Sequence, residues 1–150
     1  MASKAPILKI ARLRKSANPL PGYQSRHAAG IDLMAEIAAP IQMAPLERRA
    51  IPTGIAVEIP AGYEGQVRPR SGRAIKEGLA LINSPGTIDS DYRGEVKVLL
   101  VNLGGQPILI HPGDRIAQLI VAPVVRAEIV EVEELAPTER GGGGFGHTGR

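Results

Sequence analysis

The sequence predicts an all-β protein, an antiparallel sandwich or barrel with one short helix, and three observations support this. Apolar and polar residues alternate with period two in several segments, as they do in half-buried strands. Gly and Pro, 18 and 13 of the 150 residues, interrupt these segments too often for long helices. Leu and β-branched residues fill the intervals between them, which distinguishes the chain from collagen and from disordered polymers.

The first clear strand is expected around Ile55, Val57 and Ile59, which alternate with Ala56 and Glu58. Further strands are predicted at Val96 to Leu100, Ile108 to Ile110, Ile116 to Val121 and Val124 to Val132. Turns are predicted between the strands at Pro19 to Gly22, Pro52 to Gly54, Pro60 to Gly62, Pro85 to Gly86, Gly104 to Pro107 and Pro112 to Gly113.

One helix is expected, from Ser71 to Glu77, with Ser71 as its amino-terminal cap and Gly78 as its carboxyl-terminal stop. The alternating pattern ends at Pro137. From Arg140 to Arg150 six of eleven residues are Gly, so this segment has no face to bury and only a ligand or partner could offset the entropy of ordering it. We therefore predict a β domain at residues 1–136 and a flexible arm at 137–150.

The composition narrows the classes of protein. The length suits one domain, and the absence of Cys together with only three His argues against a zinc enzyme. No apolar stretch is long enough to cross a bilayer, and a net charge of +3 is too small to indicate nucleic-acid binding. The amino-terminal segment is basic but poor in Ser and enters a strand-like segment, which disfavours a transit peptide. We expect a cytoplasmic protein without membrane or nucleic-acid partners.

The segment from Arg68 to Gly72 places two guanidinium groups and a hydroxyl before the predicted helix. Unpaired backbone N–H groups at a helix start attract anions, so a phosphate would fit there. The alternative is an ordinary Ser cap with solvated Arg side chains, and on this segment alone the cap is the favoured interpretation because caps are common.

The segment from Gly86 to Gly94 combines two carboxylates with Tyr92, one of four aromatic residues in the chain. It can be a polar hairpin loop or a binding site, and both interpretations stay open. The segment from Gly113 to Gln118 suits a turn that leads into a strand. Within it only Gln118, which lies among apolar residues, needs a polar partner.

The Gly-rich tail has the Gly spacing of a phosphate loop, but His147 stands in the Lys position and the tail does not lie between a strand and a helix. A P-loop ATPase is therefore disfavoured. Phe145 and the backbone amides could instead fold over a phosphorylated aromatic ligand.

In this order and spacing, five segments together resemble the motifs of the trimeric deoxyuridine triphosphatase (dUTPase) family. The segments are Ala29 to Leu33, Pro69 to Gly72, Asn83 to Gly94, Gly113 to Gln118 and Arg140 to Gly149. The resemblance implies a jelly-roll-like subunit and a homotrimer with active sites at subunit contacts. It also implies Mg²⁺-dependent hydrolysis of dUTP to dUMP and pyrophosphate.

The resemblance also implies a role for individual residues. Asp89 would hold the attacking water, Tyr92 would stack under the deoxyribose, and Asp32 would reach Mg²⁺ through water. The uracil would be read by Asn83 and by the backbone from Gly86 to Ile88, and the triphosphate would be held by Arg70, Ser71, Gly72 and Gln118. A neighbouring subunit would supply Arg140, Phe145, Gly146 and Thr148.

The sequence departs from the commonest family pattern at Arg73, where an apolar residue is more usual, and at Gly142 and His147, where Ser is frequent. Because a carboxylate is a weak base toward water, positioning and charge neutralisation are expected to dominate catalysis. Two alternatives remain: a dCTP deaminase, which resembles dUTPases in architecture, and a dUTP-binding sensor without turnover.

Overall fold

The computed structural model describes residues 5–144. In chain order its elements are β1 (Lys9–Arg12), β2 (Ile31–Met34), β3 (Ile41–Met43), β4 (Arg48–Glu58), β5 (Tyr63–Arg68), α1 (Ser71–Glu77), β6 (Leu79–Leu81), β7 (Gly86–Ile88), β8 (Glu95–Asn102), β9 (Ile108–Ile110) and β10 (Arg115–Pro123). All strand pairs are antiparallel. The predicted all-β class with one short helix is confirmed.

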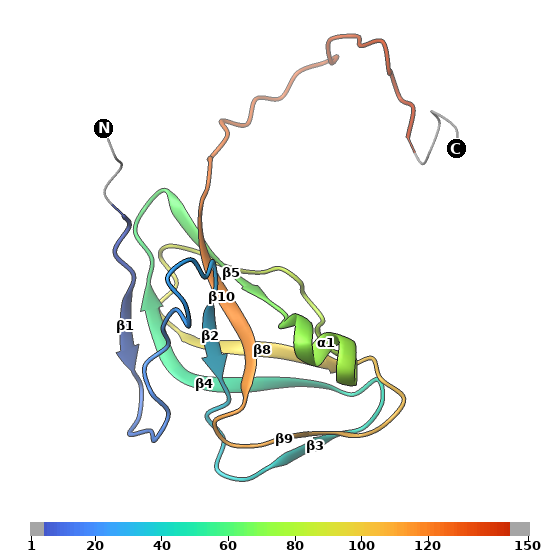
Figure 1. Ribbon diagram of the computed structural model, residues 1–150. Coiled ribbons are helices and arrows are strands. Elements are labelled where there is room, and N and C mark those ends of the chain that lie inside the picture. Colours follow the sequence, from blue (N-terminus) through green and yellow to red (C-terminus); the bar gives the residue numbers. More distant parts are fainter. Residues whose placement is uncertain (1–4, 145–150) are drawn as a thin grey trace.

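The strands form three sheets (Figure 1). One sheet has the order β1-β4-β8-β6, a second has the order β2-β10-β5-β7, and a third pairs β3 with β9. The second sheet positions most of the candidate site, because Asp32 on β2 pairs with Gln118 on β10, and Gln118 pairs with Arg68 on β5. Three segments distant in sequence are thereby placed side by side at one end of this sheet.

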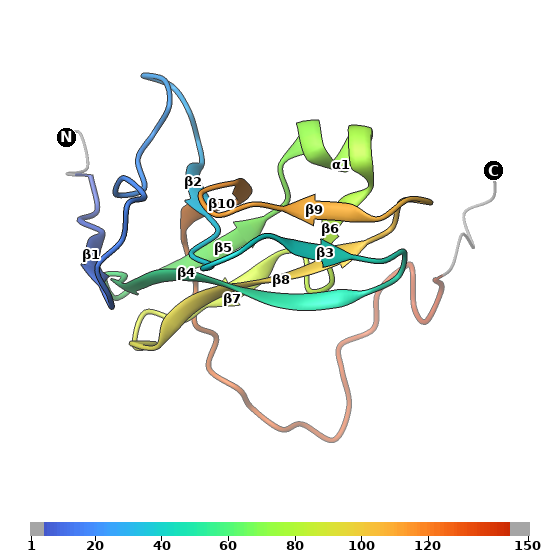
Figure 2. The ribbon, with the colours of Figure 1, turned by 90° about the horizontal axis from the view of Figure 1, so that it is seen from below.

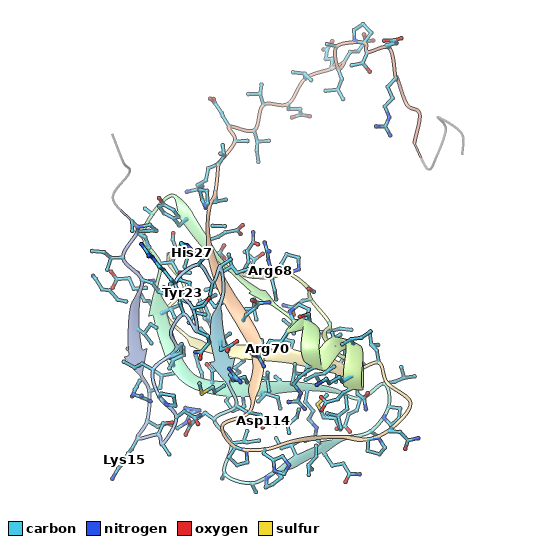
Figure 3. The ribbon with its side chains drawn as sticks, viewed as in Figure 1. Lys15, Tyr23, His27, Arg68, Arg70 and Asp114 are labelled. Atoms are coloured by element: carbon cyan, nitrogen blue, oxygen red, sulfur yellow. The ribbon has the colours of Figure 1, made fainter. Side chains whose placement is uncertain are left out.

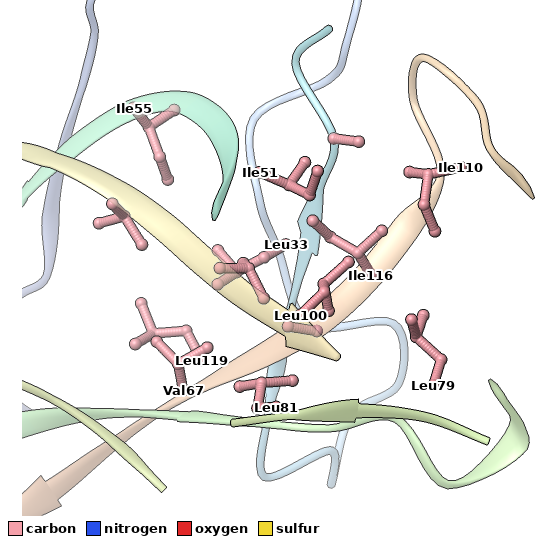
Figure 4. Packing of buried hydrophobic residues seen from close by; sticks show 14 of the residues in the cluster. Leu33, Ile51, Ile55, Val67, Leu79, Leu81, Leu100, Ile110, Ile116 and Leu119 are labelled. Atoms are coloured by element: carbon pink, nitrogen blue, oxygen red, sulfur yellow. The ribbon is translucent and has the colours of Figure 1, made fainter. Parts of the chain in front are cut away.

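The core lies between the two larger sheets (Figure 4). Leu33, Ile51, Leu100, Ile116 and Leu119 are almost completely buried there. Leu100 comes from the alternating part of β8, so the period-two pattern marks the inward face of that strand, whereas β2 and β4 bury consecutive residues. Burial of such side chains is worth about 1.5–3 kcal/mol each.

Most predicted strands are confirmed, but the predicted turn from Pro52 to Gly54 is wrong. β4 runs through this segment, and its register with β8 shifts between Pro52 and Ala56. Gly54 has a φ of +70°, and the buried Thr53 hydroxyl donates to the carbonyl of Val96 at 2.5 Å. The Pro and Gly therefore mark a bulge inside a long strand rather than its end.

The expected strand from Val124 to Val132 is also absent from the structure. After Pro123 the chain leaves the sheets and runs outward as irregular, exposed backbone (Figures 1 and 2). Within residues 5–144 no neighbouring strand pairs with this segment, so its alternating residues have no ladder to join. The proposed domain boundary at residue 136 stays a prediction.

The helix has the predicted bounds, but its cap is different. Arg70 occupies the cap position without a side-chain hydrogen bond, and Ser71 is the first helical residue. Gly78 ends the helix with a φ of 75°, as predicted. In the described part of the chain no helix is long and apolar enough to cross a membrane.

Candidate active site

A buried carboxylate between two guanidinium groups forms the centre of the site. Asp32 on β2 is 7% exposed. Its Oδ1 lies 2.9 Å from Nε of Arg70, and its Oδ2 lies 3.2 Å from Nη1 of Arg115. A buried charge needs such partners. Figure 3 shows Arg70 between β2 and α1.

A cavity of about 950 Å³ opens next to this triad. Asp32, Arg70, Ser71, Gly72 and Gln118 all line it, so the cavity gathers five predicted site residues from three segments. Cationic side chains and a hydroxyl around an open cavity are suited to a phosphorylated ligand. We call this cavity the anion cavity.

Gln118 finds its polar partner in the backbone beside Arg70. Its Nε2 donates to the carbonyl of Pro69 at 2.9 Å. A Cβ at Gly30 would come within 3.1 Å of the Gln118 Cδ atom and closer still to Oε1, so glycine at position 30 gives this side chain its place. Gln118 therefore links β10 to the start of α1.

Arg73 contacts three segments around the anion cavity. Its Nε lies 2.6 Å from Oε2 of Glu77, and its Nη1 lies 3.3 Å from Oδ2 of Asp114. Its Nη2 also donates to the carbonyl of Leu109 at 3.4 Å. The guanidinium thus ties α1 to the turn before β10, which explains how a charged residue is accommodated here.

The residues expected to bind the nucleoside line a different cleft, which we call the β7–β8 cleft. Asn83, Ile88, Asp89 and Tyr92 contribute to its wall, and its volume is about 360 Å³. β7 is the edge of its sheet, so the backbone from Gly86 to Ile88 has one unpaired side among the described strands. Such an edge can hydrogen-bond the rim of a base.

Tyr92 is half exposed at the mouth of this cleft, and its ring has a fixed anchor. Its hydroxyl donates to the carbonyl of Glu95 at 3.0 Å, and its backbone N–H donates to the carbonyl of Asp89 at 3.1 Å. Asp89 also borders a smaller hollow with Asp91 and Arg126. Asp89 and Tyr92 therefore share one tight connection, as the sequence suggested.

The two clefts have no lining residue in common in the portion of the chain described. One chain brings together the residues expected for the triphosphate and, separately, those expected for the nucleoside.

Among the arm residues, Arg140 is exposed and its Nε donates to the carbonyl of Gly143 at 2.7 Å. Phe145, Gly146, His147 and Thr148 lie outside the described residues.

Two contacts in this site were not predicted from the sequence. Arg115 faces Asp32, although we considered it only as part of a turn. Gly30 makes room for Gln118, although we considered it only as part of a motif. The position of both residues inside the resembling motifs was the available signal.

Comparisons with known proteins agree with this arrangement. The family model described as dUTPase matches residues 16–149. A deoxyuridine 5'-triphosphate nucleotidohydrolase of Anaeromyxobacter sp. (strain Fw109-5) is 57% identical over 145 residues, covering 95% of this chain and 97% of that protein. One of Caldanaerobacter subterraneus subsp. tengcongensis is 53% identical over 144 residues, covering 95% and 97%.

Solved structures show the same likeness. The dUTPase of Staphylococcus bacteriophage 80alpha with dUPNHPP matches with a TM-score of 0.81 at 28% identity, covering 96% of this chain and 99% of that one. A mutant dUTPase of phage phi11 of S. aureus, whose structure concerns a structural Mg(II) ion, matches with a TM-score of 0.74 at 27% identity, covering 85% and 97%.

The fold and its anion cavity define a β-structured hydrolase with the jelly-roll-like architecture that the resemblance implied. The chain belongs to the dUTPase family. The sequence-based prediction of this family and of its enzyme class is thereby confirmed.

Proposed function

We propose that this protein hydrolyses dUTP to dUMP and pyrophosphate by attack of water on the α-phosphorus. Its role would be to supply dUMP for thymidylate synthesis and to keep uracil out of DNA. The observation that carries the proposal is the anion cavity, in which Asp32, Arg70, Ser71 and Gln118 converge from separate strands and α1. Family membership supports the choice of dUTP as substrate.

In this proposal the triphosphate binds in the anion cavity. Arg70 and the Ser71 hydroxyl bind phosphate oxygens together with the backbone N–H of Gly72. Gln118 holds the carbonyl of Pro69 and so fixes the backbone that precedes Arg70. Fixing the triphosphate in one conformation converts attack by water into a reaction between preorganised groups, which is where most of the rate is gained.

The nucleoside occupies the β7–β8 cleft. The backbone from Gly86 to Ile88 and the side chain of Asn83 read the uracil edge. The Tyr92 ring packs under the deoxyribose, where a 2′-hydroxyl has no room. Asp89 accepts a hydrogen bond from the attacking water and orients it. A site that binds a base through hydrogen bonds rejects a mismatched base strongly, since its polar groups would stay unpaired.

Mg²⁺ is the proposed cofactor, and the residues fit it. A carboxylate has about four lone-pair positions, of which Arg70 and Arg115 use two, so the Asp32 side chain retains acceptors facing the cavity. Mg²⁺ usually keeps several waters and takes one or two carboxylates plus substrate phosphates. Asp32 would therefore hold it through water, and when bound it would supply neutralisation of phosphate charge.

A homotrimer with shared sites is the proposed assembly. The anion cavity and the β7–β8 cleft share no described residue, which favours a complete site built from two copies. The segment from Val124 to Leu135 also exposes a run of large apolar side chains, with Ile129 at 95% and Leu135 at 87% exposure. Such a surface is suited to burial against another copy.

The Gly-rich arm is proposed to complete the site of a neighbouring copy. Arg140 would contact the terminal phosphate, Phe145 would cover the uracil, and Gly146 and Thr148 would bind phosphate. A cytoplasmic location, expected from the sequence, agrees with the absence of Cys.

The test is pyrophosphate release from dUTP, dCTP, dTTP and UTP in parallel, with Mg²⁺ and then with excess chelator. The proposal expects rapid release from dUTP alone and its loss with chelator. Ammonia released from dCTP would favour a deaminase instead, and tight dUTP binding without turnover would favour a sensor.

A further inference from the structure

Gly94 lies next to the hydroxyl-bearing end of the Tyr92 ring, in the place where any other residue would put its Cβ against that ring. A Cβ built at position 94 would lie 2.6 Å from Cζ of Tyr92 and 2.9 Å from Cε2. Carbon atoms in contact are normally about 3.5–4.0 Å apart, so no side chain fits there while the ring keeps its place. The φ of Gly94 is not in the left-handed region, so backbone conformation does not explain the glycine.

The hydroxyl at the tip of the Tyr92 ring is held in place by Glu95. The Tyr92 hydroxyl donates to the carbonyl of Glu95 at 3.0 Å. The Glu95 side chain is itself fixed, since its Oε1 accepts from the backbone N–H of Gly54 at 2.8 Å and lies 2.5 Å from Nη2 of Arg14. Glu95 therefore links the Tyr92 ring to the bulge of β4. This arrangement requires that residue 94 has no side chain.

We propose that Gly94 is a positioning residue that sets the sugar specificity of the site by fixing the Tyr92 ring. This inference rests on the proposed function, in which that ring packs under the deoxyribose. A side chain at position 94 would push the ring by about 1 Å, since its tip is the obstacle. The displaced ring would no longer fill the space that a 2′-hydroxyl needs.

The obstacle to a side chain at position 94 lies at the surface rather than in the core. The atoms that a Cβ would meet belong to the far end of a side chain that is 45% exposed, not to the backbone or the core. The ring can move outward, so the effect falls on the geometry of the cleft rather than on the stability of the sheet.

The experiment compares kcat/KM for dUTP and UTP in the full-length protein and in Gly94→Ala. A shift of about 1 Å in a positioned group costs up to about a hundredfold in rate. We expect kcat/KM for dUTP to fall by roughly tenfold to a hundredfold, while the value for UTP changes by less than about threefold, so that their ratio falls by at least about threefold. The matched control is Gly105→Ala, because a Cβ at Gly105 meets nothing within 4 Å.

A double-mutant cycle separates positioning from a merely structural role. In a Tyr92→Ala background, Gly94→Ala should leave the dUTP to UTP ratio unchanged, because the ring through which it acts is gone. Tyr92→Phe, which keeps the ring and loses the bond to Glu95, should give a smaller loss of the ratio and covers the case in which Gly94→Ala does not fold.

The outcomes are distinct. An unchanged ratio in Gly94→Ala, or an equal further loss in the Tyr92→Ala background, would overturn the role of Gly94 while leaving the proposed function intact. If Gly94→Ala does not fold, an unchanged ratio in Tyr92→Phe would overturn it. A parent protein without dUTP turnover would instead refute the proposed function on which the inference depends.

Discussion

Asp32 Oδ1 lies 2.9 Å from Nε of Arg70, which joins β2 to the cap residue of α1. The same carboxylate also faces Arg115 at 3.2 Å. Asp32 therefore does two things in one place. In the proposed mechanism it sets the direction of a guanidinium that would bind phosphate, and it keeps acceptors for the cation that would accompany the phosphate.

Asp32→Asn tests this double role. The amide keeps the size of the side chain but removes the charge that Arg70 and Arg115 share, and it would weaken the proposed contact with hydrated Mg²⁺. We expect turnover to fall by about 10- to 100-fold and the Mg²⁺ concentration for half-maximal activity to rise. A titration of activity against Mg²⁺ measures both, with Glu58→Gln, on β4, as the control. An unshifted Mg²⁺ titration would remove Asp32 from the proposed cation contact.

Gln118→Ala tests the link to Pro69. Loss of the 2.9 Å hydrogen bond should cost about 1 kcal/mol of stability, since water can reach the freed carbonyl from the cavity. The larger effect should be on KM for dUTP, because the backbone before Arg70 loosens. Thermal unfolding and steady-state kinetics check the two effects, and a variant with reduced stability but parental KM would limit Gln118 to a structural role.

Arg73→Leu examines the charged residue that replaces the usual apolar one. Its ion pairs with Glu77 and Asp114 are partly exposed, so their loss should cost less than about 1 kcal/mol. Removing a cation beside the anion cavity should nevertheless raise KM for dUTP severalfold. Arg48→Leu, which removes an equal charge from the start of β4, is the matched control. Equal KM values for the two variants would contradict a contribution of Arg73 to dUTP binding.

The edge strand β1 should respond to pH through its contact with β4. The hydrogen bond from Lys9 and the charge of Lys9 lower the pKa of the Glu58 carboxyl below its ordinary value of 4.5. A lowered folded-state pKa means that the contribution to stability is present above pH 4.5 and is lost as the pH falls through the folded-state pKa.

The Tm difference between the parent and Glu58→Gln should accordingly shrink as the pH is lowered from 7 through about 4.5 toward 3. It should also shrink in high salt, because the pair is exposed. A Tm difference that grows on acidification would show that Lys9 does not stabilise the charged form of Glu58.

Much of the fold could be predicted from local pattern. β8, β9 and β10 lie where the sequence placed them, and β9 and the part of β8 up to Leu100 alternate buried with more exposed residues. Pro52 to Gly54 misled the prediction, because the same residues that form turns also form bulges, and only pairing with β8 distinguishes the two. Val124 to Val132 misled it for a related reason, since an alternating segment becomes a strand only where a partner edge is available.

The contacts within the candidate site were harder to predict from local sequence patterns. The Ser71 cap was wrong because Arg70 takes the cap position while its guanidinium pairs with Asp32, a contact made across distant segments. The space that Gly30 leaves for Gln118 depends on tertiary packing, and the space that Gly94 leaves for Tyr92 depends on the conformation of their shared connection, so residue types alone indicate neither. The resemblance to a family brought these positions together before any of the contacts were known.

The central claim is that the anion cavity of one copy and the β7–β8 cleft of another form one site for dUTP hydrolysis. The most direct measurement is dUTP turnover by trimers co-assembled at equal amounts from Arg70→Ala and Asp89→Asn, each inactive alone. Random assembly leaves about a quarter of shared sites with both clefts intact, so we expect about a quarter of the parent activity. Mixed trimers no more active than the two variants alone would contradict the account.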